Sequence, residues 1–158
     1  MQADCHPNFD IWLTISLLCV IIIPLTSFET GVPPMLLRPH HLLCLQNFSG
    51  HGYNPAFTWH LSGMLHTLHM NPETAVTLVC GCDDLCKACP HHQNGVCRSA
   101  AKTAKLDADV LTAAGLSADA SGTWASFAAA ARSILHGAAF HQICACCEWY
   151  PLCRRNGG

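Results

Sequence analysis

The sequence predicts a mainly α-helical protein, a small single helical domain with at most one short β element. Apolar residues from Phe57 to Leu68 recur at spacings of three and four, which indicates one buried helix face. Residues 98–143 are rich in alanine and leucine and contain no cysteine, so this stretch favours helices without cross-links. Only residues 74–80 are short and β-branched, as expected for a strand.

The start and stop signals place the individual helices. Proline stands in the first turn of the first helix, and Asn54 precedes a second proline as a helix cap. Gly115 follows the last apolar residues of a later helix, where a left-handed glycine often ends one. We expect helices over residues 39–48, from Pro55 to Asn71-Pro72, and over 99–114, 122–136 and 138–150.

Composition excludes some functions and points to one kind of chemistry. The 158 residues suit one domain, and a net charge of −2 with 11% charged residues gives no footprint for nucleic acid. The unusual feature is twelve cysteines and eleven histidines. A disulfide scaffold usually spreads its cysteines through the chain, whereas most of these lie in two dense groups. Metal binding by thiolates is therefore favoured over disulfides.

The first 34 residues form an apolar leader that precedes a Cys/His-rich metal-binding domain, residues 35–158. Residues 11–25 are uncharged and apolar, and with their flanks (9–28) they approach the length of a membrane span. No basic residue precedes them, which argues against a cleaved signal peptide. We interpret the leader as sequence translated upstream of a natural start at Met35, or as a membrane anchor. The expected location is cytoplasmic, with membrane anchoring through 9–28 as the alternative.

Each dense cysteine group contains a C-x2-C pair. In the first group Cys86 and Cys89 precede proline, and in the second Cys144 and Cys147 form the pair. Two residues between thiolates allow both to face one metal. Cys97 and Cys153 close the two groups, and six thiols exceed what one tetrahedral zinc needs. The surplus favours an iron–sulfur cluster, 4Fe–4S rather than 2Fe–2S, with zinc as the alternative cofactor.

The segment Arg38 to Cys44 is a second candidate. His40 and Cys44 are four residues apart, share a helix face, and are possible additional metal ligands. His41 is expected to be a polar tip that points elsewhere. The remaining cysteines are expected to be buried free thiols rather than ligands: Cys5, Cys19, Cys80, Cys82 and Cys146.

Three motifs resemble a known family. LRPHHLLCLQNFSGHGY at 37–53, DDLCKACP at 83–90 and IC-x2-C-x-W-x3-C at 143–153 are similar to the bacterial and archaeal proteins called domain of unknown function 1284. The resemblance extends from about Leu36 to Cys153. It implies that the protein binds an iron–sulfur cluster and that its natural start lies near Met35. The function of the family is unknown. The resemblance also implies a set of family-type cysteines: Cys86, Cys89, Cys97, Cys144, Cys147 and Cys153, with Cys44 as a seventh.

Three functions are compatible with these residues. The first is an iron–sulfur protein that transfers electrons or senses redox state, with an unidentified redox or protein partner. The second is a structural zinc module in an interaction protein. The third is a metal-dependent enzyme that uses Arg38, His40, His41 and Cys44. The sequence does not decide whether the protein is an enzyme, and no familiar catalytic motif is present.

Overall fold

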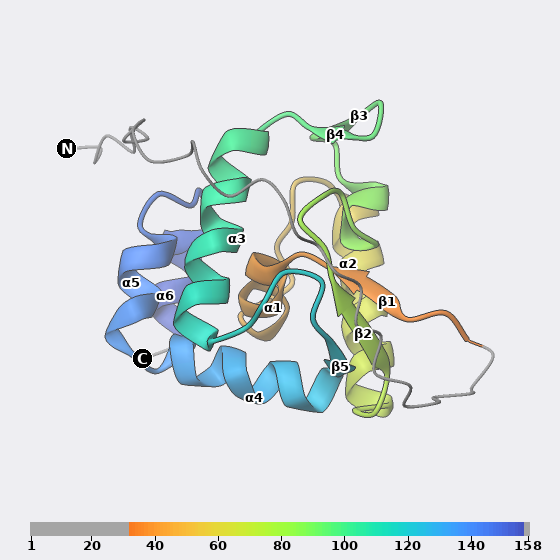
Figure 1. The fold of residues 1–158 in the computed structure, drawn as a ribbon. Coiled ribbons are helices and arrows are strands. Elements are labelled where there is room, and N and C mark those ends of the chain that lie inside the picture. The colour runs from red at the N-terminus through yellow and green to blue at the C-terminus, as the bar shows by residue number, and fades with distance from the viewer. Residues whose placement is uncertain (1–31, 157–158) are drawn as a thin grey trace, which may run out of the picture. The chain divides into compact units, whose positions relative to one another are not determined.

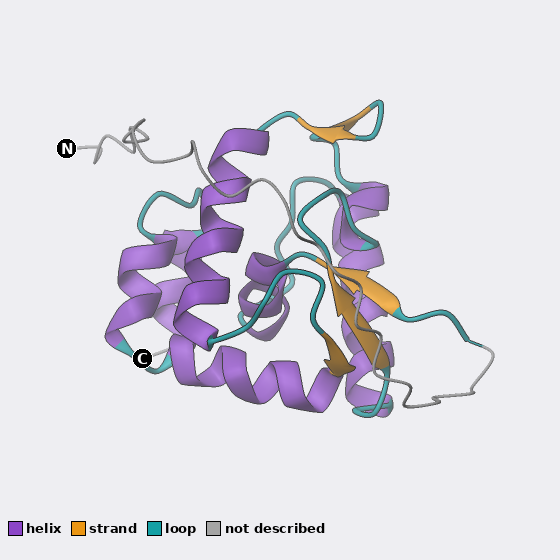
Figure 2. Cartoon of the chain, in the orientation of Figure 1, coloured by secondary structure: helices purple, strands orange, loops and turns teal. Residues whose placement is uncertain are grey.

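The structure is a computed structural model that describes residues 32–156, and the described residues from Pro34 onward belong to one compact unit. The predictions for the leader, including an anchor at 9–28 or 11–25, lie outside the described residues. Figures 1 and 2 show that helices dominate the described part, which confirms the mainly α prediction. The helices are α1 (Pro39–Gln46), α2 (Pro55–Met70), α3 (Ala100–Ala114), α4 (Trp124–Leu135), α5 (Ala138–Cys144) and α6 (Tyr150–Asn156).

The β structure is more extensive than the single element predicted. Strand β1 (Met35–Leu37) pairs in parallel with β2 (Ala75–Leu78), which pairs antiparallel with β5 (Ser121–Thr123). A separate hairpin joins β3 (His92–Gln93) to β4 (Val96–Cys97). The prediction of at most one β element is wrong because strands of two or three residues are too short to show an alternating pattern. Strands β1 and β5 form only by pairing with β2, which is far away in sequence, and β3 and β4 pair with each other in a local hairpin.

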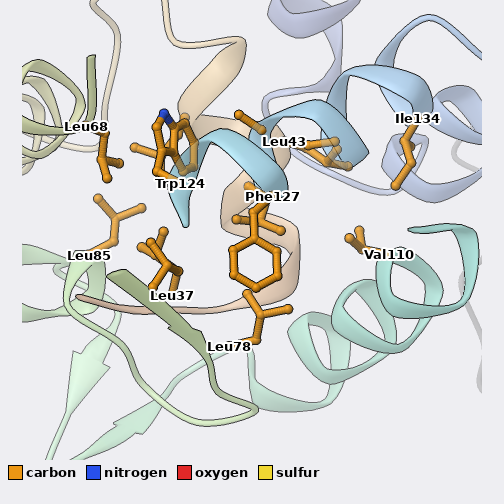
Figure 3. Close-up of a cluster of buried hydrophobic side chains, with 14 of the residues drawn as sticks. Leu37, Leu43, Leu68, Leu78, Leu85, Val110, Trp124, Phe127 and Ile134 are labelled. Carbon is orange, nitrogen blue, oxygen red and sulfur yellow. The ribbon is translucent and has the colours of Figure 1, made fainter. Parts of the chain in front are cut away.

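Helix α1 lies at the centre of the fold, where it contacts α3 and α4 (Figure 1). Its residues Leu42, Leu43 and Leu45 are nearly inaccessible to solvent. Figure 3 shows the core around it, where Leu37 of β1 and Phe127 of α4 come together with apolar side chains of α2 and α3. This packing holds in place the short segment between Arg38 and Cys44, which carries candidate site residues.

The helix ends follow the local signals of the sequence. The side chain of Asn54 accepts a hydrogen bond from Phe57 N at 2.8 Å and caps α2. Gly115 ends α3 with φ of +64°, in the left-handed region that favours glycine.

The helix predicted over 138–150 is wrong as one element. Helix α5 ends at Cys144, a turn follows with Cys147 N donating to Cys144 O at 2.8 Å, and α6 begins at Tyr150. Pro151 explains the break, since proline fits the first turn of a new helix and not the interior of an existing one. The break separates the cysteines of the second group onto a helix end, a turn and a new helix.

Candidate metal centre

One cavity of about 150 Å³ brings together cysteines that are far apart in the sequence. It is much larger than the space that one water molecule needs. Five of the six cysteines predicted as ligands line it, together with Cys44, which was predicted as an additional ligand. The cysteines that line the cavity are Cys44, Cys86, Cys89, Cys97, Cys147 and Cys153. Cys144 does not line it and packs instead against the hydrophobic core.

The first cysteine group, Cys86, Cys89 and Cys97, lies on short irregular elements. Cys86 belongs to the 3-10 helix η1 (Leu85–Ala88), Cys89 directly follows it, and Cys97 ends the β3–β4 hairpin. Burial is the main cause that raises the pKa of the Cys86 thiol far above its ordinary value, and the charge of Asp83 adds to it. Burial also raises the pKa of Cys89.

The second cysteine group, Cys144, Cys147 and Cys153, lies on α5, α6 and the turn between them, and Cys44 of α1 lies close to it. Burial raises the pKa of the Cys44 thiol well above its ordinary value, and the charges of the other three thiols raise it further. Burial raises the pKa of Cys144 to about 12, and the charges of Cys147 and Cys153 contribute. The Cys44 and Cys144 thiols are therefore neutral at physiological pH unless a cation stabilises the thiolate form.

A buried network joins Arg38 to α3 through Asp107. The Arg38 Nε and Nη2 donate to Asp107 Oδ2 at 2.9 and 2.6 Å, and His40 Nδ1 lies 2.6 Å from Asp107 Oδ1. Only 4% and 3% of the Arg38 and Asp107 side chains are exposed. Burial would raise the pKa of the Asp107 carboxyl, but the hydrogen bonds from His40 and Arg38 hold it below its ordinary value. Asp107 is thus a buried carboxylate that fixes the ring of His40.

A second carboxylate, Asp83, holds the neighbouring histidine and the first cysteine group. Its Oδ2 accepts hydrogen bonds from Arg38 N and His41 Nδ1, each at 2.6 Å, and its Oδ1 accepts one from Cys86 N at 3.0 Å. Burial would raise the pKa of this carboxyl, but the charge and hydrogen bond of His41 lower it far below its ordinary value. Asp83 therefore remains ionised, and both of its carboxylate oxygens accept hydrogen bonds.

Several site residues differ from the sequence prediction. His41 does not point away from the site, because it lines the same cavity as His40, and their rings lie 4.3 Å apart. Arg38, His40, His41 and Cys44 thus meet in one place. The prediction of buried free thiols is wrong for Cys80, which is exposed, while Cys82 and Cys146 are only half-buried.

The sequence reasoning did not identify the two carboxylates. Asp107 could have been recognised, because it lies three residues before Val110 on a buried face of α3 where aspartate is unexpected. Asp83 stands next to Asp84, and no pattern in the sequence shows that only the first of them is fully buried.

Aromatic side chains close one side of the cavity. The ring of Tyr53 lies 4.4 Å from that of His91 and 5.2 Å from that of Trp149, and all three residues line the cavity. Burial raises the pKa of Tyr53 to about 12. The cysteines therefore share the cavity with aromatic side chains, which would lie beside a bound metal.

Among the described residues, one group of three potential ligands has all of its ligand atoms within 4.8 Å of one another, namely His41, Asp83 and Cys86. No three cysteine sulfurs of residues 32–156 lie that close together. Within the same residues, the structure contains no helix of sufficient length and apolar character to cross a membrane.

Comparison with known proteins gives a family and no named relative. No curated protein and no solved structure matches the chain. A family model described as "Protein of unknown function (DUF1284)" matches residues 52–153, which include both C-x2-C pairs. The match begins after the whole of L-R-P-H-H (37–41), and residues 37–51 of the first motif lie before the matched range. Because the matched range covers more than half of the chain, the protein belongs to the DUF1284 family.

Proposed function

We propose that the cavity holds an iron–sulfur cluster, with 4Fe–4S favoured over 2Fe–2S, and that the protein transfers electrons or senses redox state. One observation carries the proposal. Six cysteines from segments separated by up to about a hundred residues line a single cavity, and each of the six is a free thiol. Thiolates are the usual ligands of such clusters, and four suffice for either cluster type.

The number of thiols supports a cluster over a single zinc ion. Six cysteines line the cavity, whereas one tetrahedral zinc ion needs four ligands. A cluster places its own iron and sulfide between the thiolates, so it suits ligands that surround a wider space.

The surroundings of the cavity also suit a cluster. Phe57, Leu61, Leu85 and Leu106 contribute apolar side chains to its lining. Burial and hydrogen bonds near the sulfurs set the reduction potential of a cluster, which supplies a one-electron centre when bound. The residues that would hold it are four of Cys44, Cys86, Cys89, Cys97, Cys147 and Cys153. The proposed setting is the cytoplasm, where thiols stay reduced, and electron transfer would require a redox partner.

The test is an analysis of iron, zinc and acid-labile sulfide in the full chain purified without oxygen. Iron and sulfide in near-equal amounts, with visible absorbance that dithionite bleaches, are expected. Zinc without sulfide would contradict the cluster and favour the structural zinc module. A colourless protein without metal would contradict both.

Matched cysteine variants then identify the ligands. Cys86→Ser and Cys89→Ser should lose most of the iron and sulfide, because both residues line the cavity. Cys80→Ser is the control, since Cys80 belongs to the same segment but is exposed and does not line the cavity. If Cys86→Ser and Cys89→Ser both kept the metal, neither cysteine would be a ligand.

A second candidate function is a metal-dependent enzyme. The observation in its favour is that Arg38, His40 and His41 line the cavity beside the cysteines, with both histidines oriented by buried carboxylates. Such histidines can accept protons from a substrate. This function requires turnover that His40→Ala abolishes while iron and sulfide remain bound.

A further inference from the structure

We propose that His41 is a nitrogen ligand of the same metal centre as Cys86, and that Asp83 positions both residues. The inference rests on the proposed function and deepens it, because it replaces an all-cysteine ligand set with a mixed one. The chemical step is simple. The Nε2 lone pair of a neutral imidazole binds iron, while the proton on Nδ1 stays in its hydrogen bond to Asp83.

Asp83 fixes the histidine and the cysteine relative to each other. The side chain of Asp83 is fully buried, and its two oxygens bind His41 Nδ1 at 2.6 Å and Cys86 N at 3.0 Å. A ring nitrogen of His41 and the sulfur of Cys86 lie within 4.8 Å of each other. One carboxylate therefore holds together two side chains that are 45 residues apart in the sequence and that line the same cavity.

Asp83 itself is a poor candidate for a ligand. Both of its oxygens already accept hydrogen bonds, and Oδ2 also accepts one from Arg38 N at 2.6 Å. A metal ion bound there would displace these donors and leave buried N–H groups without partners, which is costly. Asp83 is thus a positioning residue for the two donors around it.

The second ring nitrogen of His41 is available. Within residues 32–156 no side chain or backbone group forms a hydrogen bond with His41 Nε2. The same part of the chain contains no buried side-chain nitrogen or oxygen without a partner, so Nε2 is accessible. Since His41 lines the cavity and 14% of its side chain is exposed, the accessible nitrogen is open to a ligand there.

This arrangement is the one that metal-binding histidines usually have. A ligating imidazole typically donates its other N–H to a carboxylate, which fixes the tautomer and the direction of the lone pair. Histidine ligands occur on iron–sulfur clusters and raise their reduction potential above that of all-cysteine clusters. His40 has a similar carboxylate contact, but its partner Asp107 binds Arg38 and no cysteine backbone. The link to a thiolate ligand therefore singles out His41.

The test is pulsed EPR of the dithionite-reduced full chain, grown with ¹⁵N-labelled histidine. Directly bound histidine nitrogen should give a strong ¹⁵N coupling, and His41→Ala should abolish it. His69→Ala is the control, because His69 is exposed near the end of α2 and does not line the cavity. The coupling should be unchanged in this control.

The His41→Cys variant keeps the test valid if His41→Ala fails to fold. A thiolate at this position should retain iron and sulfide, remove the nitrogen coupling, and shift the reduction potential downwards. Iron and sulfide without a bound nitrogen in the wild type, or a coupling that survives in His41→Cys, would overturn this inference alone. A protein with neither iron nor sulfide would overturn the proposed function as well.

Discussion

The two cysteine groups reach the same cavity by different means. In the first group, Cys86 and Cys89 lie on an irregular segment that a buried carboxylate, Asp83, fixes by hydrogen bonds. In the second group, Cys153 lies on a short helix, lines the cavity and packs against the hydrophobic core, while Cys144 packs against the core outside the cavity. The first half of the candidate centre therefore has a buried polar anchor in addition to its apolar contacts, and the second half relies on apolar packing.

This difference has a physical cause. The 3-10 helix η1 has only four residues and buries Leu85 in the core, and its backbone groups need hydrogen-bond partners, one of which is Asp83. Helix α5, by contrast, places Phe140 and Ile143 in the core, where only 3% and 7% of each residue is exposed. The two halves should therefore lose unfolding free energy in response to different mutations.

The largest effect is expected for Asp83→Asn. The amide cannot accept all three hydrogen bonds that the carboxylate receives, and it removes the charge beside His41. Breaking a buried charged contact of this kind costs about 3–5 kcal/mol of unfolding free energy. Urea denaturation followed by circular dichroism measures the loss, and iron content should fall with it.

Asp84→Asn is the matched control for this variant. Asp84 is the next residue, but its partner Lys87 has 71% of its side chain in solvent. Its hydrogen bond from Leu36 N at 2.7 Å is also exposed. The loss of stability should therefore be much smaller than for Asp83→Asn. Equal losses in the two variants would show that the first group has no special anchor at Asp83.

A smaller effect is expected for Ile143→Ala in the second group. The substitution leaves a cavity in the core next to Cys144 and should cost about 2–3 kcal/mol of unfolding free energy. Val96→Ala, beside Cys97 in the first group, should change stability by less than about 0.5 kcal/mol because Val96 is 59% exposed. Thermal or urea unfolding of both variants measures the difference, and a reversed order would contradict packing as the support of the second group.

The same contrast explains what the sequence could predict. The helices and their caps at Asn54 and Gly115 follow local signals, and the structure confirms them. Strands β1 and β5 have three residues each and form only through pairing with β2, so no local signal marks them. Likewise the break after Cys144 was missed, although Pro151 in the sequence indicates it.

The residues of the candidate centre also differ in how well the sequence predicts them. Cysteine spacing identified most of the cysteines that line the cavity, because C-x2-C pairs carry their signal locally. The anchoring carboxylates could not be identified with equal ease, since aspartate is normally exposed and only the tertiary fold buries Asp83 and Asp107. The sequence placed His41 away from His40 on helical periodicity, but the cavity extends around α1 far enough to include both.

A further prediction concerns the pH dependence of the network of Arg38, His40 and Asp107. Burial lowers the pKa of His40 to about 4 from an ordinary value of 6.5, and the charges of His41 and Arg38 act in the same direction. Between these two pH values the unfolded chain binds a proton at His40 that the folded chain does not, so stability falls as the pH decreases. The expected loss between pH 7 and pH 5 is about 2 kcal/mol.

Urea denaturation at several pH values tests this expectation, with His40→Asn as the comparison. The asparagine amide can still donate to Asp107 Oδ1 in place of His40 Nδ1, but it does not titrate. Its stability should therefore vary less between pH 7 and pH 5 than that of the wild type. Asp83 and Asp107 do not interfere, because their pKa values lie below the ordinary range and they titrate at lower pH. Parallel pH curves for the two proteins would mean that protonation of His40 does not cause the loss of unfolding free energy in acid.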